Sequence, residues 1–143
     1  MTQRTDPAGH DGGRRRPPEL SALETDVMNV VWELGECTSA EVIEAFRRIR
    51  PLADTTIRTV LTNIRRKGYI ELVPTVERAH RFRATVKRTE VARRSLQSFV
   101  ARHFRGSTRE AICFLLDQEV IGEADIREIT RIIERHRRRQ GLT

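Results

Sequence analysis

The feature that most constrains this fold is a change in hydrophobic period at Gly68. Over residues 54–67 apolar side chains recur every three or four positions, which is typical of an amphipathic helix. Beyond Gly68 apolar and polar residues alternate in YIELV and AHRFRAT, two segments that a short PTVER turn separates. Alternation of this kind predicts strands, so a β-hairpin is expected to follow the helix directly.

Two further helices are predicted upstream of this point. Apolar residues repeat at helical spacing over 21–34, and Thr38 with Glu41 forms a capping box that opens another helix. This helix must stop before Pro51, and Asp54 is the expected N-cap of the helix that follows. Three helices and a hairpin in this order predict a winged helix-turn-helix, so the expected fold class is mainly α with a small β-hairpin.

Residues 87–143 are predicted to form three more amphipathic helices, each too short to bury its apolar face alone. We expect them to pair with the same helices of a second chain, as a C-terminal three-helix dimerisation region; the alternative is a monomeric core packed on the winged helix. The chain then divides into a disordered basic arm (1–18), a winged-helix DNA-binding domain (19–86) and a helical dimerisation domain (87–143). The residues expected at the dimer interface are Leu96, Phe99, Val100, Phe104, Ile112, Leu115, Leu116, Ile126, Ile129, Ile132 and Ile133.

Positive charge is concentrated in the middle of the chain. Residues 54–105 hold thirteen Lys and Arg against four Asp and Glu, whereas residues 19–53 hold three against seven. The net charge of the whole chain is +7. A local excess of this kind is expected where a polyanion docks, and it coincides with the third helix and the hairpin.

The third helix has one apolar face and one face of short hydroxyls and arginines. Ile57, Leu61 and Ile64 share a side on a helical wheel and are expected in the core. The threonines opposite them allow close approach to a DNA duplex, while Arg58 suits guanine and Asn63 suits adenine. The residues predicted to contact double-stranded DNA are Thr55, Thr56, Arg58, Thr59, Thr62, Asn63, Arg65, Arg66, Lys67, Arg78 and Arg81.

The hairpin is predicted to support this helix as a wing. Arg78 at the turn and Arg81 on the strand are placed to contact the DNA backbone or the adjacent minor groove, and residues 65–67 also suit phosphates. Phe82 is expected in the core, and His80, on the same face, is expected to be packed.

Several other classes of protein are disfavoured. The sequence lacks HExxH, GxSxG, P-loop and dinucleotide-binding motifs, so an enzyme is not expected. Its four histidines and two cysteines lack metal-ligand spacing, so no metal or cofactor is expected. The longest apolar runs span six residues, whereas a membrane-spanning helix needs about 20. The N-terminus contains no apolar segment of the kind found in a secretion signal, so secretion is not expected. We therefore expect a cytoplasmic protein that does not insert into a membrane.

Three segments resemble the BlaI/MecI family of bacterial penicillinase-type repressors: LETDVMNVVWELGECTSAEVIEAF, TTIRTVLTNIRRKGYI and ERAHRFRAT. The resemblance covers residues 19–139. It implies a homodimeric repressor that covers a promoter palindrome, often one that regulates β-lactamase or cell-wall genes in an antibiotic response. By position, it also implies major-groove contacts from Thr55, Thr56, Arg58, Thr59 and Thr62.

The resemblance further implies a route of induction. In well-known members a membrane-bound metalloprotease sensor leads to cleavage of an Asn–Phe bond in the second dimerisation helix. The matching residues here are Phe114 and Leu115, which depart from that pair. The copper-responsive branch carries C-terminal CxC pairs, and their absence here disfavours copper sensing.

Two alternative functions fit the same residues. One is a DNA-binding architectural protein without sequence preference, and the other is a winged-helix protein-interaction module whose threonine face meets a protein. A sequence-blind binder would show no preference for one duplex over another, and an interaction module would show little salt dependence towards DNA.

Overall fold

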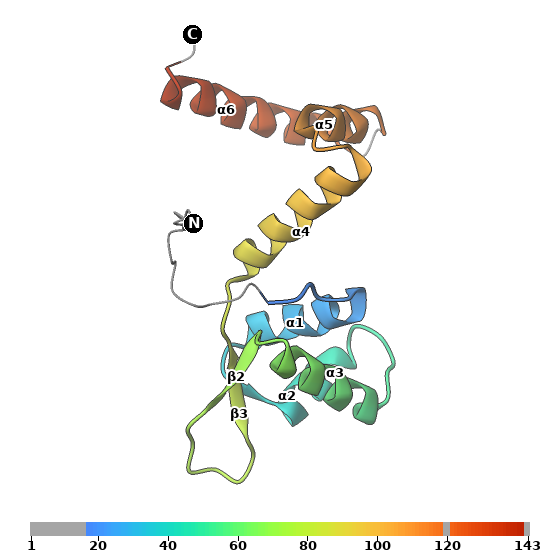
Figure 1. Ribbon diagram of the computed structural model, residues 1–143, viewed down its shortest axis with the longest axis vertical. Helices are drawn as coiled ribbons and strands as arrows, with labels where there is room; N and C mark the ends of the chain where they lie inside the picture. Colours follow the sequence, from blue (N-terminus) through green and yellow to red (C-terminus); the bar gives the residue numbers. More distant parts are fainter. Residues whose placement is uncertain (1–16, 119–120, 142–143) are drawn as a thin grey trace, which may run out of the picture. The chain divides into compact units, whose positions relative to one another are not determined.

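The computed structural model describes residues 17–118 and 121–141, and the chain divides into two units, Met1–Val91 and Ala92–Thr143. Residues 1–16 of the predicted basic arm lie outside the described residues. The elements, coloured along the chain in Figure 1, are α1 (Ala22–Leu34), β1 (Cys37–Thr38), α2 (Ser39–Phe46), α3 (Asp54–Arg66), β2 (Ile70–Val73), β3 (Arg81–Ala84), α4 (Arg88–His103), α5 (Thr108–Asp117) and α6 (Glu123–Arg139).

The first unit confirms the predicted fold class, with one addition to the sheet. The expected hairpin belongs to a three-stranded antiparallel sheet of order β1–β3–β2. In it Cys37 lies opposite Phe82, Thr38 lies opposite Arg81, and Leu72 pairs with Phe82 from the other side. A strand of two residues gives no alternation in the sequence, so only the tertiary pairing reveals β1.

The helix starts follow the predicted capping chemistry in one case and not in another. The Thr38 hydroxyl accepts a hydrogen bond from the Glu41 amide at 3.2 Å, so Thr38 is the N-cap of α2 as expected, whereas the Glu41 carboxylate pairs with Arg81 rather than completing the predicted capping box. The prediction that Asp54 caps α3 is wrong, because Ala53 is the N-cap and makes no side-chain bond. Asp54 instead lies in the first turn of α3, where its negative charge interacts favourably with the helix dipole. Its carboxylate also accepts a hydrogen bond from Arg47 at 3.3 Å.

The core of this unit lies between the three helices and the inner face of the sheet. Trp32 ties the chain beyond the wing to α1, since its Nε1 donates to the Val86 carbonyl at 2.9 Å. Gly68 has a φ of 89°, and this left-handed turn lets the chain leave α3 and enter β2 at once. The side chains that are fully buried are Val27, Met28, Val30, Val31, Cys37, Val42, Phe46, Ile57 and Ile64.

The second unit is built differently. Within the described residues, α4, α5 and α6 contain no buried side chain. Phe104 contacts Phe99 and Phe114, with ring centroids 6.1 and 5.7 Å apart, yet Phe99 and Phe114 stay exposed. These helices therefore have apolar faces but, by themselves, no core.

Candidate nucleic-acid interface

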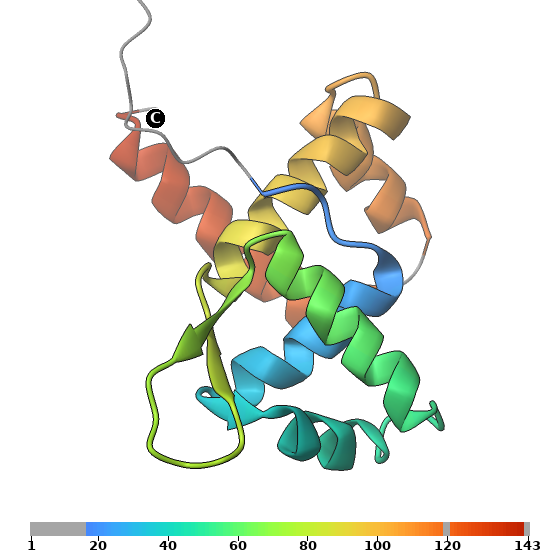
Figure 2. The same cartoon turned by 60° about the horizontal axis from the view of Figure 1, so that its bottom comes forward.

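Helix α3 is divided into a buried and an exposed face, as its sequence predicts. Ile57 and Ile64 are fully buried, and Val60 and Leu61 are nearly so. Figure 2 looks onto α3, with the loop between β2 and β3 extending beside it. Predicted contact residues that are exposed on this helix are Thr55, Arg58, Thr59, Thr62, Arg65 and Arg66, whereas Thr56 and Asn63 are half-buried.

Two of the threonine hydroxyls on this face, those of Thr59 and Thr62, are already engaged within the helix. Thr59 Oγ1 donates to the Thr55 carbonyl at 2.9 Å, and Thr62 Oγ1 donates to the Arg58 carbonyl at 3.0 Å. Their protons are therefore not available to a ligand, while the methyl groups and the remaining oxygen lone pairs are. Such a surface suits apolar contact with thymine methyl groups and close approach to the floor of a groove.

The arginines of this face lack internal partners. In the part of the chain that the structure describes, no carboxylate lies within ion-pair distance of Arg58, Arg65 or Arg66. The same holds for Arg78 in the loop between β2 and β3, which is exposed. These four guanidinium groups therefore carry charge that an external anion can neutralise.

Arg81 differs from them. Its Nε donates to Glu77 at 2.9 Å, and its guanidinium lies 3.6 Å from Glu41 on α2. The hydrogen bond and the charge of Glu77 raise the pKa of Arg81, with a smaller contribution from Glu41. The charge of Arg81 is thus matched within the protein, and this side chain connects the wing to α2.

Lys67, predicted to contact a phosphate, is also paired within the protein. Its ammonium donates to Glu24 Oε1 at 2.6 Å and to the Glu19 carbonyl at 2.9 Å. Burial raises the pKa of Glu24, but the hydrogen bonds from Lys67 and Ser21 outweigh burial, and the pKa is lowered. Because α3 ends at Arg66, the side chain of Lys67 leaves the arginine face and joins the start of α1 to the end of α3.

The expectation that His80 is packed is wrong. Strand β3 begins at Arg81, so His80 belongs to the loop and is exposed. Two further residues lie beside the arginine face without having been predicted there: Ser39 at the start of α2 and Leu72 on β2. Leu72 shares a strand face with buried Ile70, so its alternation predicts burial, yet Leu72 is exposed.

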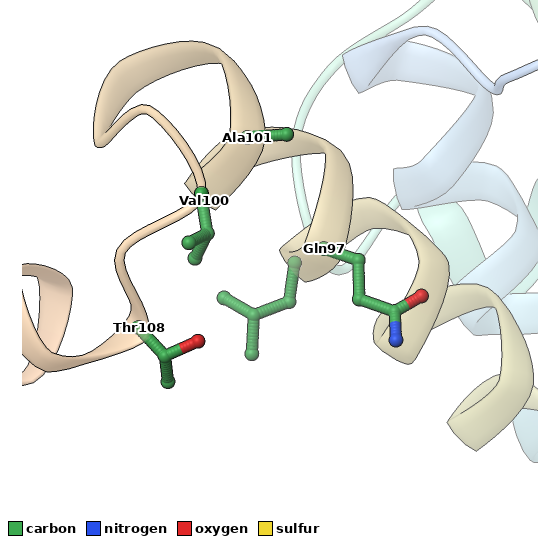
Figure 3. Close-up of a pocket in the computed structure, with 6 residues that line it drawn as sticks. Gln97, Val100, Ala101 and Thr108 are labelled. Carbon is green, nitrogen blue, oxygen red and sulfur yellow. The ribbon is translucent and has the colours of Figure 1, made fainter.

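The described helices of the second unit expose most of the predicted dimer residues. Leu96 is 63% exposed and Leu115 is 51% exposed. A hollow of about 280 Å³ is lined by residues of α4 together with Gly106 and Thr108. Figure 3 draws its lining side chains, among them Gln97 and Val100 of α4 and Thr108. The other exposed dimer residues are Phe99, Ile112, Leu116, Ile126, Ile132 and Ile133, while Val100, Phe104 and Ile129 are half-buried.

Neither a membrane span nor a metal site is found in the described ranges. No helix over residues 17–118 and 121–141 is both long and apolar enough to cross a bilayer. Within the same ranges, no group of three His, Cys, Asp or Glu side chains is placed to hold a metal ion.

The sequence matches a family model described as penicillinase repressor over residues 20–135. It is 28% identical over 118 residues to an uncharacterized 16.5 kDa protein of Latilactobacillus sakei, covering 80% of this chain and 78% of that protein. The penicillinase repressor of Bacillus licheniformis is 22% identical over 126 residues, with coverages of 88% and 98%. The methicillin resistance regulatory protein MecI of Mammaliicoccus sciuri is 21% identical over 117 residues, with coverages of 82% and 94%.

Two solved structures are similar at a TM-score below 0.5. The DNA-binding domain of the repressor BlaI has a TM-score of 0.47 at 22% identity, covering 54% of this chain and 93% of that one. Monomeric Bacillus licheniformis BlaI in complex with the blaP half-operator has a TM-score of 0.46 at 23% identity, covering 52% and 89%.

Proposed function

This chain belongs to the penicillinase repressor family, and from that premise we propose that it represses transcription as a homodimer bound to a palindromic promoter operator. Helix α3 enters the major groove, and the loop between β2 and β3 supports it along the backbone. Repression follows because the bound dimer occludes RNA polymerase. The chain acts in the cytoplasm, where its DNA target is, and is not an enzyme.

The observation that carries the DNA-binding part is the exposed outer face of α3. Its threonines are short and exposed, and two of their hydroxyls are bonded within the helix, so the helix axis can approach the base edges closely. Arg58 lies among them, and no carboxylate of residues 17–118 and 121–141 pairs with it, so it can contact guanine with both nitrogens. Arg65 and Arg66, at the end of the helix, suit phosphates, as does Arg78 on the wing.

Dimerisation is supported by the exposed apolar faces of the second unit. Helices of 16, 10 and 17 residues bury none of their described side chains, although isoleucine, leucine and phenylalanine line them. A surface of this kind is unstable in water unless another surface covers it. A second copy supplies a self-complementary cover through an isologous interface, and the two recognition helices then bind two half-sites.

We also propose that proteolysis relieves repression, with a membrane-bound metalloprotease sensor as the partner. The bond between Phe114 and Leu115 lies in α5, whose apolar side chains belong to the proposed dimer face. Cutting α5 would separate the two half-site contacts. The loss of effective concentration then weakens operator binding by a factor of about 10² to 10⁴.

Selection from a random pool of duplexes tests the function without knowledge of the operator. We expect the full-length protein to enrich an inverted repeat and to elute from size exclusion with twice the monomer mass of 16.6 kDa. Binding of the enriched duplex should fall steeply with salt, and a scrambled duplex should bind about a thousandfold more weakly or worse. Equal binding of both duplexes would indicate an architectural protein, and weak, salt-insensitive binding would indicate a protein-interaction module.

A further inference from the structure

A hollow of about 240 Å³ lies between α3 and the sheet of the first unit, Met1–Val91, which we call the winged unit. It combines an apolar floor with a cationic rim, and no carboxylate contributes to its lining. The volume is slightly below the range of about 300–1,000 Å³ typical of drug-sized ligand pockets, so it fits a molecule of one or two rings. The lining residues are Ser39, Arg58, Leu61, Thr62, Arg65, Ile70, Leu72, His80 and Phe82.

The floor of this hollow comes from the inner face of the sheet. Ile70, Leu72 and Phe82 share that face, because Leu72 lies two residues after Ile70 and opposite Phe82. Ile70 and Phe82 are buried, whereas Leu72 remains 39% exposed. Because Leu72 lines the hollow and stays exposed, it offers an apolar surface there that a planar ring can cover.

The rim is positive and unpaired. Arg58 and Arg65 lie one above the other on α3, seven residues apart, and neither has an ion-pair partner over residues 17–118 and 121–141. The nearby wing arginines differ, since Arg81 is paired with Glu77 and Arg83 with Glu71. Of the arginines without an ion-pair partner, Arg58 and Arg65 are the two that line the hollow, so they supply the charge for a ligand bound there.

We propose that this hollow binds a small organic anion with a planar apolar body, and that its occupancy excludes DNA. The carboxylate of the ligand binds Arg58 and Arg65, and its ring covers Leu72. Exclusion follows because Arg58 cannot contact a ligand carboxylate and a guanine at once; this second half rests on the proposed function. A DNA phosphate could bind the same two arginines, but the attached sugar is polar and would then lie over the apolar floor. An aromatic anion matches both the cationic rim and the apolar floor, so it fits the hollow better than a DNA backbone does.

Titration of the full-length, ¹⁵N-labelled protein with 2-naphthoate tests the site in the absence of DNA. We expect the amides of Ser39, Leu72 and Phe82 to shift, while those of α6 do not. Acetate supplies the charge without the ring, and 2-naphthylmethanol supplies the ring without the charge. Each should bind about tenfold more weakly or worse, since each loses one part of the complementarity. Equal binding of naphthoate and naphthylmethanol, or no localised shift, would overturn the proposal.

Two variants and a matched control identify the side chains. Leu72→Ser removes the exposed part of the apolar floor and Arg65→Gln removes one rim charge, and each should weaken naphthoate binding about tenfold. Ile49→Ser removes another exposed apolar side chain, one that does not line the hollow, and should leave binding unchanged. A dispersed amide spectrum establishes that each variant is folded. If the control weakened binding as much as Leu72→Ser, the ligand would be bound elsewhere.

Competition tests the second half of the proposal. At low salt, saturating naphthoate should displace a fluorescently labelled duplex of random sequence at least tenfold more effectively than acetate at the same ionic strength. Simultaneous binding of naphthoate and the duplex would refute the claim that the ligand excludes DNA. If only DNA, and not naphthoate, shifted the amides around the hollow, the hollow would be a binding site for the DNA backbone instead. If no duplex binds at all, the repressor function fails, whereas the naphthoate titration still decides whether the site exists.

Discussion

Replacing Lys67 by methionine should destabilise the winged unit and leave its DNA-facing surface intact. The lysine ammonium donates to Glu24 at 2.6 Å and to the Glu19 carbonyl at 2.9 Å. Glu24 is only 8% exposed and Lys67 is 29% exposed, so water replaces these bonds incompletely when the ammonium is removed. Hydrogen bonds to charged groups contribute about 1.5–3 kcal/mol. Since Glu24 keeps its bond from the Ser21 amide at 2.8 Å, we expect a loss of about 2 kcal/mol.

Urea unfolding of the full-length protein, followed by tryptophan fluorescence, measures this loss. Trp32 is the only tryptophan in the chain and lies in the winged unit, so its signal reports this unit alone. With a slope of about 2 kcal/mol per molar urea, the midpoint should fall by about 1 M. Arg66→Met is the matched control, because Arg66 is exposed and pairs with no carboxylate of the residues that the structure describes, and its stability should change by no more than about 0.5 kcal/mol.

DNA binding and pH distinguish this explanation from the phosphate contact first expected of Lys67. The control Arg66→Met should weaken DNA binding, whereas Lys67→Met should not, provided that the variant is folded. Because the pKa of Glu24 is lowered in the folded protein, its carboxylate contributes fully to the free energy of unfolding at any pH above the pKa of the unfolded chain, about 4.3. This contribution is lost as the pH falls through the lower pKa of the folded protein. The stability gap should therefore be full at pH 7 and close in acid. A Lys67→Met protein of normal stability that binds DNA weakly would refute the reasoning.

Four further predictions concern other parts of the chain. Arg58→Ala should cost about 1–3 kcal/mol in operator binding and relax discrimination at one base pair, as measured on singly substituted duplexes; unchanged base preference would refute the assignment of the reading face. Thr62→Ser keeps the hydroxyl and removes the methyl, so it should weaken binding to a thymine-containing duplex by about 0.8 kcal/mol and not to its uracil counterpart. Ile132→Glu should convert the dimer to a monomer in light scattering and weaken operator binding about a hundredfold or more; a stable dimer would place the interface elsewhere. Burial and the charge of Glu41 raise the pKa of Cys37 to about 11, so iodoacetamide at pH 8 should modify exposed Cys113 first and Cys37 only on unfolding, as read by mass spectrometry.

Features with a local cause could be predicted from the sequence. The spacing of Ile57, Leu61 and Ile64 determines which side of α3 is buried, because the helical period relates sequence position to direction. The change of period at Gly68 determines where the strands begin, and the left-handed φ of that glycine is the reason the change is abrupt. The exposed threonine face followed from these two facts alone.

Features that depend on distant partners were decided only by the tertiary structure. Lys67 looks like the last member of a run of three cations, yet Glu24, 43 residues away, accepts its hydrogen bond. Likewise, Arg81 looks like a free wing arginine until Glu41 on α2 is placed beside it. A charge pattern gives the number of cations in a segment, but whether each one is available to DNA depends on which carboxylates the fold brings within a few ångströms, and local periodicity carries no information about that distance.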